Sequence, residues 1–224
     1  MPNPSFEPYG GLNAVDCASK STCFAVGFDY TGTVAERYTK GSWHLLAALN
    51  DKPGNLIDVT CWSASGCDVV GWGISLWNGR KWSKVSVPPD VPASEVTCSS
   101  LTLCEGVGTV DVSGGMDRME GALWDGTNWT TQPFGSSSRY PEFNSIFCST
   151  PGESCVAVGQ ASPGVVAARM TDGTWSTERI PLPHGAVNGG QLNSVDCTSD
   201  GTCFVVGRAY LKGDAYHLLI ERSG

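Results

Sequence analysis

The chain has 224 residues, of which 41% are hydrophobic, and a formal net charge of −8. It has no run of Lys and Arg of the kind that a nucleic-acid surface needs, and no apolar stretch near eighteen residues that could span a membrane. Its 28 Gly, 13 Pro and eight Trp exclude a disordered chain and favour a globular, turn-rich β protein.

The first predicted element is a hairpin over residues 14–27, "AVDCASKSTCFAVG". The phrase recurs at 58–71, 95–108, 145–159 and 194–207, and the last copy matches the first at nine of fourteen positions. The first cysteines of successive copies stand 37 to 50 residues apart. Periods of this size indicate a repeat architecture, and we number the five copies as the first to fifth repeats.

Each of the first four repeats continues into a further apolar segment, a turn and a Trp. The turn segments are "YTKGSW" (38–43), "WNGRKW" (77–82), "WDGTNW" (124–129) and "MTDGTW" (170–175). Gly after Asn or Asp allows the positive φ of tight hairpin turns, so each repeat predicts four short antiparallel strands. Units of this kind and period are typical of propeller blades. We therefore expect an all-β, five-bladed β-propeller in a single domain, 1–224.

The expected blades are residues 11–55, 56–94, 95–143, 144–191, and 192–224 together with 1–10. The last repeat ends in "AYHLLIERSG" and has no fourth strand with a Trp. Residues 4–9 have no repeat of their own, and Phe6 stands about where such a strand would carry its aromatic residue. We expect the N-terminal strand to complete the last blade and close the ring.

All ten cysteines fall in pairs within the predicted hairpins. The expected disulfides, one in each blade, are Cys17–Cys23, Cys61–Cys67, Cys98–Cys104, Cys148–Cys155 and Cys197–Cys203. Opposed positions of a hairpin suit an S–S bond, and each small ring contributes about 2 kcal/mol in the chain-entropy model. The alternative is zinc, but structural zinc prefers closer cysteine pairs in sets of four ligands, so we expect no metal and no cofactor.

Disulfides persist outside the cytosol, so the cysteine pattern predicts a secreted or extracytoplasmic protein. The opening "MPNPSFEPYG" lacks the charged and apolar regions of a secretory signal, and we interpret the sequence as a mature domain without its signal peptide. A cytosolic protein with reduced thiols is the alternative.

The phrases "LNSVDCTSDGTCFVVG", "LIERSG" and "WNGRKW" resemble the Cys-paired β-propeller repeats of secreted actinobacterial proteins. The resemblance covers nearly the whole chain and is specific for blade structure, but it implies no activity. The expected architecture is also similar to that of five-bladed tachylectin-type lectins, without shared motifs. A shared fold does not by itself define a function.

The loops that differ between repeats are expected on one face of the propeller, where binding usually occurs. Around the ring closure they supply Asp29, Tyr30, Arg208, Tyr210, Lys212 and Asp214, and across the third and fourth repeats Asp117, Arg118, Arg139, Tyr140 and His184; Trp72 stands apart as a possible stacking platform. Aromatic rings beside polar groups are typical of sugar sites. The alternative is that these are solvated loop residues.

A catalytic interpretation starts from Asp16 and Asp196, which precede the first cysteines of the first and fifth repeats. Across a closed ring they could form a general acid and base pair, with Asp29, Arg208, Tyr210, Lys212 and His184 as further candidates. The alternative is that each Asp caps a turn or binds the backbone of the neighbouring blade. The sequence contains no G-x-S-x-G, H-E-x-x-H or phosphate-loop motif.

Together these features predict a lectin-like, carbohydrate-binding module. The alternatives are an enzyme with one asymmetric site (a carbohydrate hydrolase or lyase, or a biosynthetic cyclase) and a protein-interaction scaffold. We expect a small-molecule or glycan ligand, no nucleic acid, no membrane insertion and a monomer.

Overall fold

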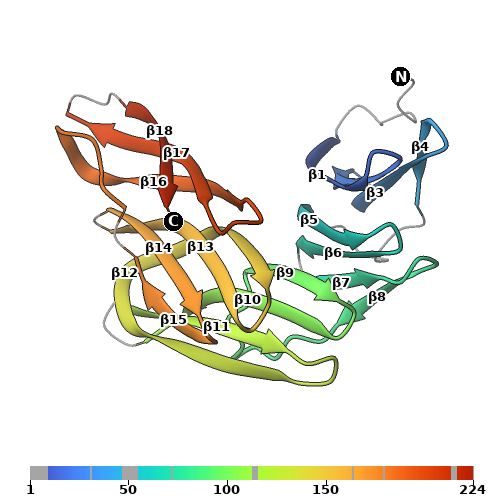
Figure 1. Cartoon of the computed structure of the whole chain (residues 1–224), viewed down its shortest axis with the longest axis horizontal. Helices are drawn as coiled ribbons and strands as arrows, with labels where there is room; N and C mark the ends of the chain where they lie inside the picture. The colour runs from blue at the N-terminus through green and yellow to red at the C-terminus, as the bar shows by residue number, and fades with distance from the viewer. Residues whose placement is uncertain are drawn as a thin grey trace. The chain divides into compact units, whose positions relative to one another are not determined.

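The computed structural model describes residues 10–30, 32–46, 55–71, 73–112, 116–162, 164–178, 180–212 and 216–223 (Figure 1). All regular elements in these ranges are strands, and none of the described residues forms a helix that could cross a membrane. The chain divides into two compact units. Residues 1–87 and 98–101 form the first, and residues 88–97 and 102–224 form the second.

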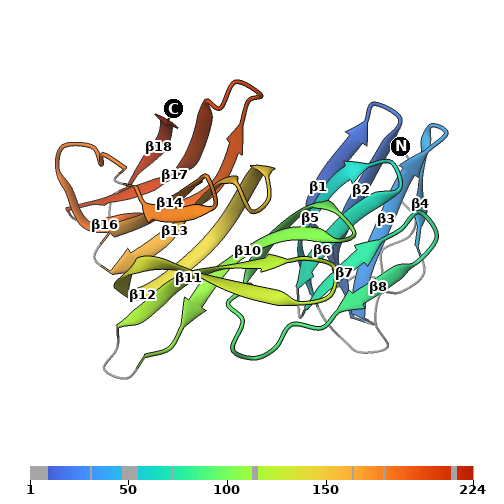
Figure 2. The ribbon, with the colours of Figure 1, turned by 60° about the horizontal axis from the view of Figure 1, so that its bottom comes forward.

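The first unit contains two four-stranded antiparallel sheets, each in chain order (Figure 2). The first sheet consists of β1 (Gly11–Ser19), β2 (Thr22–Asp29), β3 (Gly32–Thr39) and β4 (Ser42–Leu45). The second sheet consists of β5 (Leu56–Ser63), β6 (Gly66–Gly71), β7 (Ile74–Trp77) and β8 (Trp82–Val85). The prediction of four antiparallel strands is confirmed for these two repeats.

The remaining strands follow one another in a single hydrogen-bonded path, β18-β17-β16-β14-β13-β12-β11-β10-β9, with β15 beside β14. Their bounds are β9 (Glu95–Ser100), β10 (Leu103–Val110), β11 (Asp117–Trp124), β12 (Trp129–Thr150), β13 (Ser154–Ser162), β14 (Gly164–Thr171), β15 (Thr174–Thr177), β16 (Ala186–Cys197), β17 (Cys203–Leu211) and β18 (Tyr216–Ser223). The third and fourth repeats therefore share the long strand β12, and one parallel pair, Gly164 with Gly189, links the fourth repeat to the fifth.

The expectation that Arg139 and Tyr140 lie in a variable loop is wrong, because residues 135–143 lie inside β12. The first part of β12 pairs with β11, where Arg118 lies opposite Ser137, and the later part pairs with β13, where Arg139 lies opposite Ser162. The strand passes from one partner to the next with local breaks in its extended conformation, at Gly135 (φ 69°) and Tyr140. Tyr140, with φ of 50°, marks the point where the strand bends.

The cysteines form the expected disulfides. Cys17–Cys23, Cys61–Cys67, Cys148–Cys155 and Cys197–Cys203 each join directly opposed residues of a hairpin, with Cα atoms 3.9 to 4.1 Å apart. Cys98 and Cys104 are also disulfide-bonded. Five disulfides indicate an oxidising, extracytoplasmic environment.

Packing between the first two sheets depends on aromatic rings. Phe24 of the first sheet is fully buried, and its ring centroid lies 6.1 Å from Trp77 and 6.3 Å from Trp82 of the second sheet. In the second unit Phe134 stacks on Trp175 at 4.7 Å. Of the four repeat Trp residues, Trp175 is buried, with 3% exposed, and the other three are half-buried.

One carboxyl group is buried in the second unit beside this cluster. Glu105 of β10 is 0% exposed, and the indole N–H of Trp175 donates a hydrogen bond to its Oε1 at 3.2 Å. Burial raises the pKa of Glu105 to about 7, although hydrogen bonds from Trp175 and from the backbone N–H of Gly152 favour the charged form. The group therefore binds a proton more tightly in the folded chain than in the unfolded one.

This pKa predicts a specific pH dependence of stability. A raised folded-state pKa contributes stability below the unfolded value of 4.5 that is lost as pH rises to about 7, a change of roughly 3 kcal/mol. Glu105→Gln should remove this dependence and melt at a higher temperature than the wild type at pH 8, with the difference vanishing at pH 4. Thermal melts across this range measure it, with the exposed Glu153→Gln as control. Parallel curves for Glu105→Gln and wild type would contradict the assignment.

Candidate functional site

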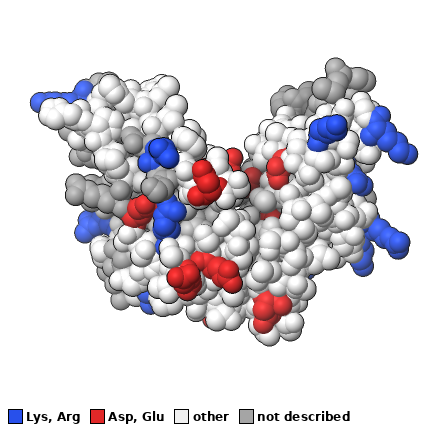
Figure 3. Space-filling model, viewed as in Figure 1, with Lys and Arg blue, Asp and Glu red and all other residues white. Residues whose placement is uncertain are grey.

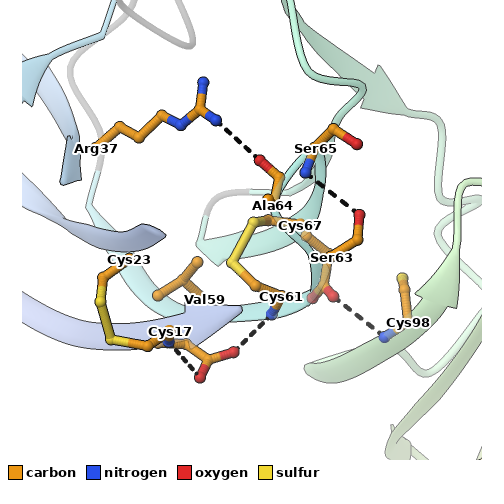
Figure 4. Close-up of a disulfide and its surroundings, with 12 residues drawn as sticks. Cys17, Cys23, Arg37, Val59, Cys61, Ser63, Ala64, Ser65, Cys67 and Cys98 are labelled. Atoms are coloured by element: carbon orange, nitrogen blue, oxygen red, sulfur yellow. Dashed lines mark hydrogen bonds between the residues drawn. A yellow bond between two sulfur atoms is a disulfide. The ribbon is translucent and has the colours of Figure 1, made fainter. Parts of the chain in front are cut away.

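The predicted acid–base candidate Asp16 holds two backbone amides. Its Oδ1 accepts a hydrogen bond from the Cys17 N–H at 2.7 Å, and its Oδ2 accepts one from the Cys61 N–H of the second sheet at 2.6 Å (Figure 4). Asp196 accepts a hydrogen bond from the Cys197 N–H at 2.9 Å. Asp16 and Asp196 belong to different units, so their pairing across a ring stays a prediction. The backbone-binding alternative is confirmed for Asp16.

A second carboxylate has the same role. Asp68 of β6 is 0% exposed, and its Oδ1 accepts a hydrogen bond from the Cys98 N–H at 3.1 Å. Burial, reinforced by the charge of nearby Asp58, raises the pKa of Asp68 well above its usual value. Burial likewise raises the pKa of Asp58, whose Oδ1 accepts a hydrogen bond from the Val59 N–H at 2.9 Å. These acids organise backbone at sheet junctions, and Asp68 cannot reach a substrate in solvent.

The roles of the two predicted acids can be separated by mutation. Asp16→Ala removes the acceptor of a part-buried amide in the neighbouring sheet, so it should destabilise the first unit by about 1–3 kcal/mol. It should also speed hydrogen exchange at the amides of β5. Asp196→Ala, which in the described contacts loses a hydrogen bond to the adjacent residue, is the matched control and should cost less. Equal exchange rates in β5 for both variants would refute the bridging role of Asp16.

Two of the predicted ligand-binding residues lie together on the fifth repeat. The guanidinium of Arg208 donates a hydrogen bond to the side-chain carbonyl of Gln191 at 2.7 Å and lies over the ring of Tyr210 at 5.5 Å. Tyr216 lies directly opposite Tyr210 in the β17–β18 pairing, and Leu218 lies opposite Arg208. Since paired residues share a sheet face, these side chains form one surface, which we call the Arg208 platform.

The Arg208 platform is open to solvent. Tyr210 is 37% exposed, Tyr216 60% and Leu218 80%. The hydrogen bond from Arg208 to Gln191 fixes the guanidinium while leaving other N–H groups of its planar fork to donate elsewhere. The surface thus combines two aromatic rings, an apolar side chain and oriented donors.

The other predicted binding residues do not assemble into one site. Arg118 is paired with Glu120 of its own strand. Arg139 and Tyr140 are exposed at the bend of β12, and the hydrogen bonds and ring contacts found among the described residues do not join His184 to either. Asp117 lies opposite Ser138, beside Arg139.

The remaining candidates lie at a strand end, in turns or outside the described residues. Asp29 accepts a hydrogen bond from the Gly32 N–H at 3.0 Å and so shapes its own turn, and Tyr30 is 63% exposed. Both lie in the first unit, so their proximity to the Arg208 platform stays a prediction. Lys212 is exposed after β17. Trp72 and Asp214 lie outside the described residues.

Sequence reasoning did not single out Gln191, Glu120 or Tyr216. Strand register could have found the first, because the pair of Leu192 with Gly207 places Gln191 opposite Arg208. The hairpin of β17 and β18 likewise places Tyr216 opposite Tyr210. The pairing of Glu120 with Arg118 follows from the side-chain period of two along β11.

Among the described residues, the charged side chains indicate neither a metal site nor, on the face drawn in Figure 3, a continuous basic surface. Within the described ranges, no group of three or more His, Cys, Asp or Glu side chains could hold a metal ion. On the face drawn in Figure 3, the Lys and Arg side chains lie in separate small groups rather than on one continuous basic surface.

No protein-family model matches the chain, and no curated protein sequence matches it significantly. Solved structures do. YCF48 bound to D1 peptide matches with a TM-score of 0.55 at 14% identity, over 96% of this chain and 68% of that one. YCF48 from Cyanidioschyzon merolae gives 0.54 at 12% identity, over 95% and 73%. A hypothetical selenium-binding protein from Sulfolobus tokodaii gives 0.57 at 9% identity, over 98% and 68%. These likenesses establish a propeller-like, all-β fold.

Proposed function

We propose that this chain is a ligand-binding β-propeller module of an extracytoplasmic compartment, and that its ligand is a carbohydrate. The observation that carries the proposal is the Arg208 platform, where Arg208, Tyr210 and Tyr216 share one exposed sheet face. Tyrosine rings cover the apolar C–H faces of a sugar, and a fixed guanidinium donates to its hydroxyl groups. The module binds its ligand without transforming it.

The proposal includes a ring of five blades built from the five repeats, with one disulfide in each. The two four-stranded sheets of the first unit and the disulfide-linked hairpins support it. The predicted closing strand at residues 4–9 lies outside the described residues, and the single-domain, monomeric, secreted form is part of the proposal.

The enzyme alternative has less support. Asp16 and Asp68 are engaged with backbone amides at a sheet junction, and the raised pKa of Asp68 comes from burial that also excludes substrate. The described contacts do not join His184 to another candidate catalytic residue.

The scaffold alternative rests on a specific observation. Below the Arg208 platform, the same face of β17 and β18 exposes Phe204, Val206 and Ile220, at 45%, 43% and 75%. The corresponding face of the first sheet buries Phe24 and Val26 against the second sheet. The scaffold alternative therefore takes this face as uncovered, which differs from the closed five-bladed ring, and exposed apolar patches of this kind mark docking surfaces. The YCF48 structure that contains a D1 peptide is a propeller-like protein with a polypeptide ligand.

A glycan array with the intact disulfide-bonded protein tests the proposal. We expect binding to a restricted set of glycans, with a loss of about tenfold in affinity for Tyr210→Ala and for Tyr216→Ala, since each removes a stacking ring. Tyr140→Ala, which removes a tyrosine that is 67% exposed at the bend of β12, should leave binding unchanged. No glycan hit would reject carbohydrate binding and favour the scaffold; equal losses in all three variants would reject the platform.

A further inference from the structure

A cleft of about 310 Å³ lies between the fourth and fifth repeats, at their cysteine hairpins. Its walls include Ser149, Ser154 and Arg169 from the fourth repeat and Thr198, Ser199 and Asp200 from the hairpin of the fifth. We call it the hairpin cleft. Cys203 lies at one end of β17 and Arg208 five residues along the strand, so the cleft and the Arg208 platform are about 17 Å apart.

At the junction between the first two sheets, an arginine side chain contacts the neighbouring cysteine hairpin. There the guanidinium of Arg37 donates a hydrogen bond to the backbone carbonyl of Ala64, in the second hairpin, at 3.0 Å (Figure 4). Arg169 holds the equivalent position in the fourth repeat, because it lies opposite Val156 as Arg37 lies opposite Phe24. Arg169 lines the cleft and also lies near Glu178 of its own repeat, with Nε and Oε2 3.4 Å apart.

One smaller residue leaves further space. Phe24 packs at the first junction on Trp77, which lies opposite Cys67. At the fourth repeat the position of Phe24 is held by Val156, which lines the cleft. The phenyl ring of the first junction is thus replaced by a smaller side chain.

The backbone N–H of the first cysteine also has a different acceptor at the two junctions. The Cys61 N–H donates to Asp16 of the preceding sheet, whereas the Cys197 N–H donates to Asp196 of its own repeat. Phe147 stands immediately before the first cysteine of the fourth repeat, as Asp16 does in the first, and it lines the cleft. An aromatic ring thus replaces the bridging carboxylate.

We propose that the hairpin cleft is a second ligand site, which binds one neutral sugar ring; this inference rests on the carbohydrate function proposed above. The serine and threonine hydroxyls and the guanidinium of Arg169 supply donors and acceptors for sugar hydroxyls, and Phe147 supplies an apolar surface. The volume suits one ring, being at the lower end of the range for small-molecule sites.

The charges in the cleft favour a neutral ligand over an acidic one. Arg169 is balanced by Glu178. Asp200 accepts hydrogen bonds from the Thr198 hydroxyl at 2.6 Å and the Thr202 N–H at 3.0 Å, and these contacts lower its pKa and hold it ionised. An anionic ligand would therefore meet the ionised Asp200 in the cleft, where the guanidinium of Arg169 already has Glu178 nearby.

Saturation-transfer NMR with methyl glycosides of glucose, galactose, mannose and N-acetylglucosamine at millimolar concentration tests the cleft. The Tyr210→Ala variant should still give a signal, because the second site is intact. Two further variants are each combined with Tyr210→Ala. Ser199→Trp fills the cleft, and Arg169→Met removes the guanidinium donor without filling it. Each should weaken the affinity obtained from that signal at least about tenfold. Ser19→Trp, at the equivalent position of the first hairpin, is the matched control.

The outcomes separate this inference from the function on which it rests. Complete loss of signal in Tyr210→Ala alone would show that the Arg208 platform binds the sugar and would overturn the cleft as a second site. Signal that survives both Ser199→Trp and Arg169→Met would also overturn the cleft. No signal in the wild type would overturn both. Near-ultraviolet circular dichroism of each variant checks that the fold is kept, and Arg169→Met keeps the test valid where Ser199→Trp fails to fold.

Discussion

The structure depends on how one backbone amide is satisfied wherever two sheets meet at a cysteine hairpin. The N–H of the first cysteine needs an acceptor, because burying an unpaired amide is costly. In the first unit the preceding sheet supplies it, through Asp16 for Cys61 and through Asp68 for Cys98. Because each acceptor belongs to the neighbouring sheet, these hydrogen bonds make the packing of one sheet specific for the next. The disulfide beside each amide keeps the hairpin in the shape that presents it.

The same constraint explains why the junctions differ. Where the preceding sheet provides a carboxylate and a large ring, as at Asp16 and Phe24, these side chains bridge the two sheets. Where the amide is capped within its own repeat, as at Cys197, the preceding sheet is free to carry Phe147 and Val156, and a cleft remains. Asymmetry between repeats therefore arises at the junctions as well as in the variable loops.

Much of the fold could be predicted from the sequence because its signals are local. The cysteine spacing and the Asn-Gly and Asp-Gly turns define hairpins by short-range geometry, and the disulfides and the strands of the first two repeats follow from them. The continuous β12 could not be predicted in this way, because polar residues at 135–143 are typical of a loop. Pairing with both β11 and β13 makes them part of a strand. Pairing between distant segments is a tertiary effect that composition does not encode.

The candidate site shows the same division. Arg208 and Tyr210 were predicted because a charged and an aromatic residue stand close together in the chain. Gln191 could have been predicted from hairpin register alone. The hairpin cleft could not, since it results from differences that meet only when the repeats are aligned in space: Val156 at the position of Phe24 and Phe147 at the position of Asp16. In a repeat protein a binding site can thus be made by removing packing from a scaffold whose other junctions retain it. Each missing side chain then costs stability at that junction, and a bound ligand restores part of the lost contact.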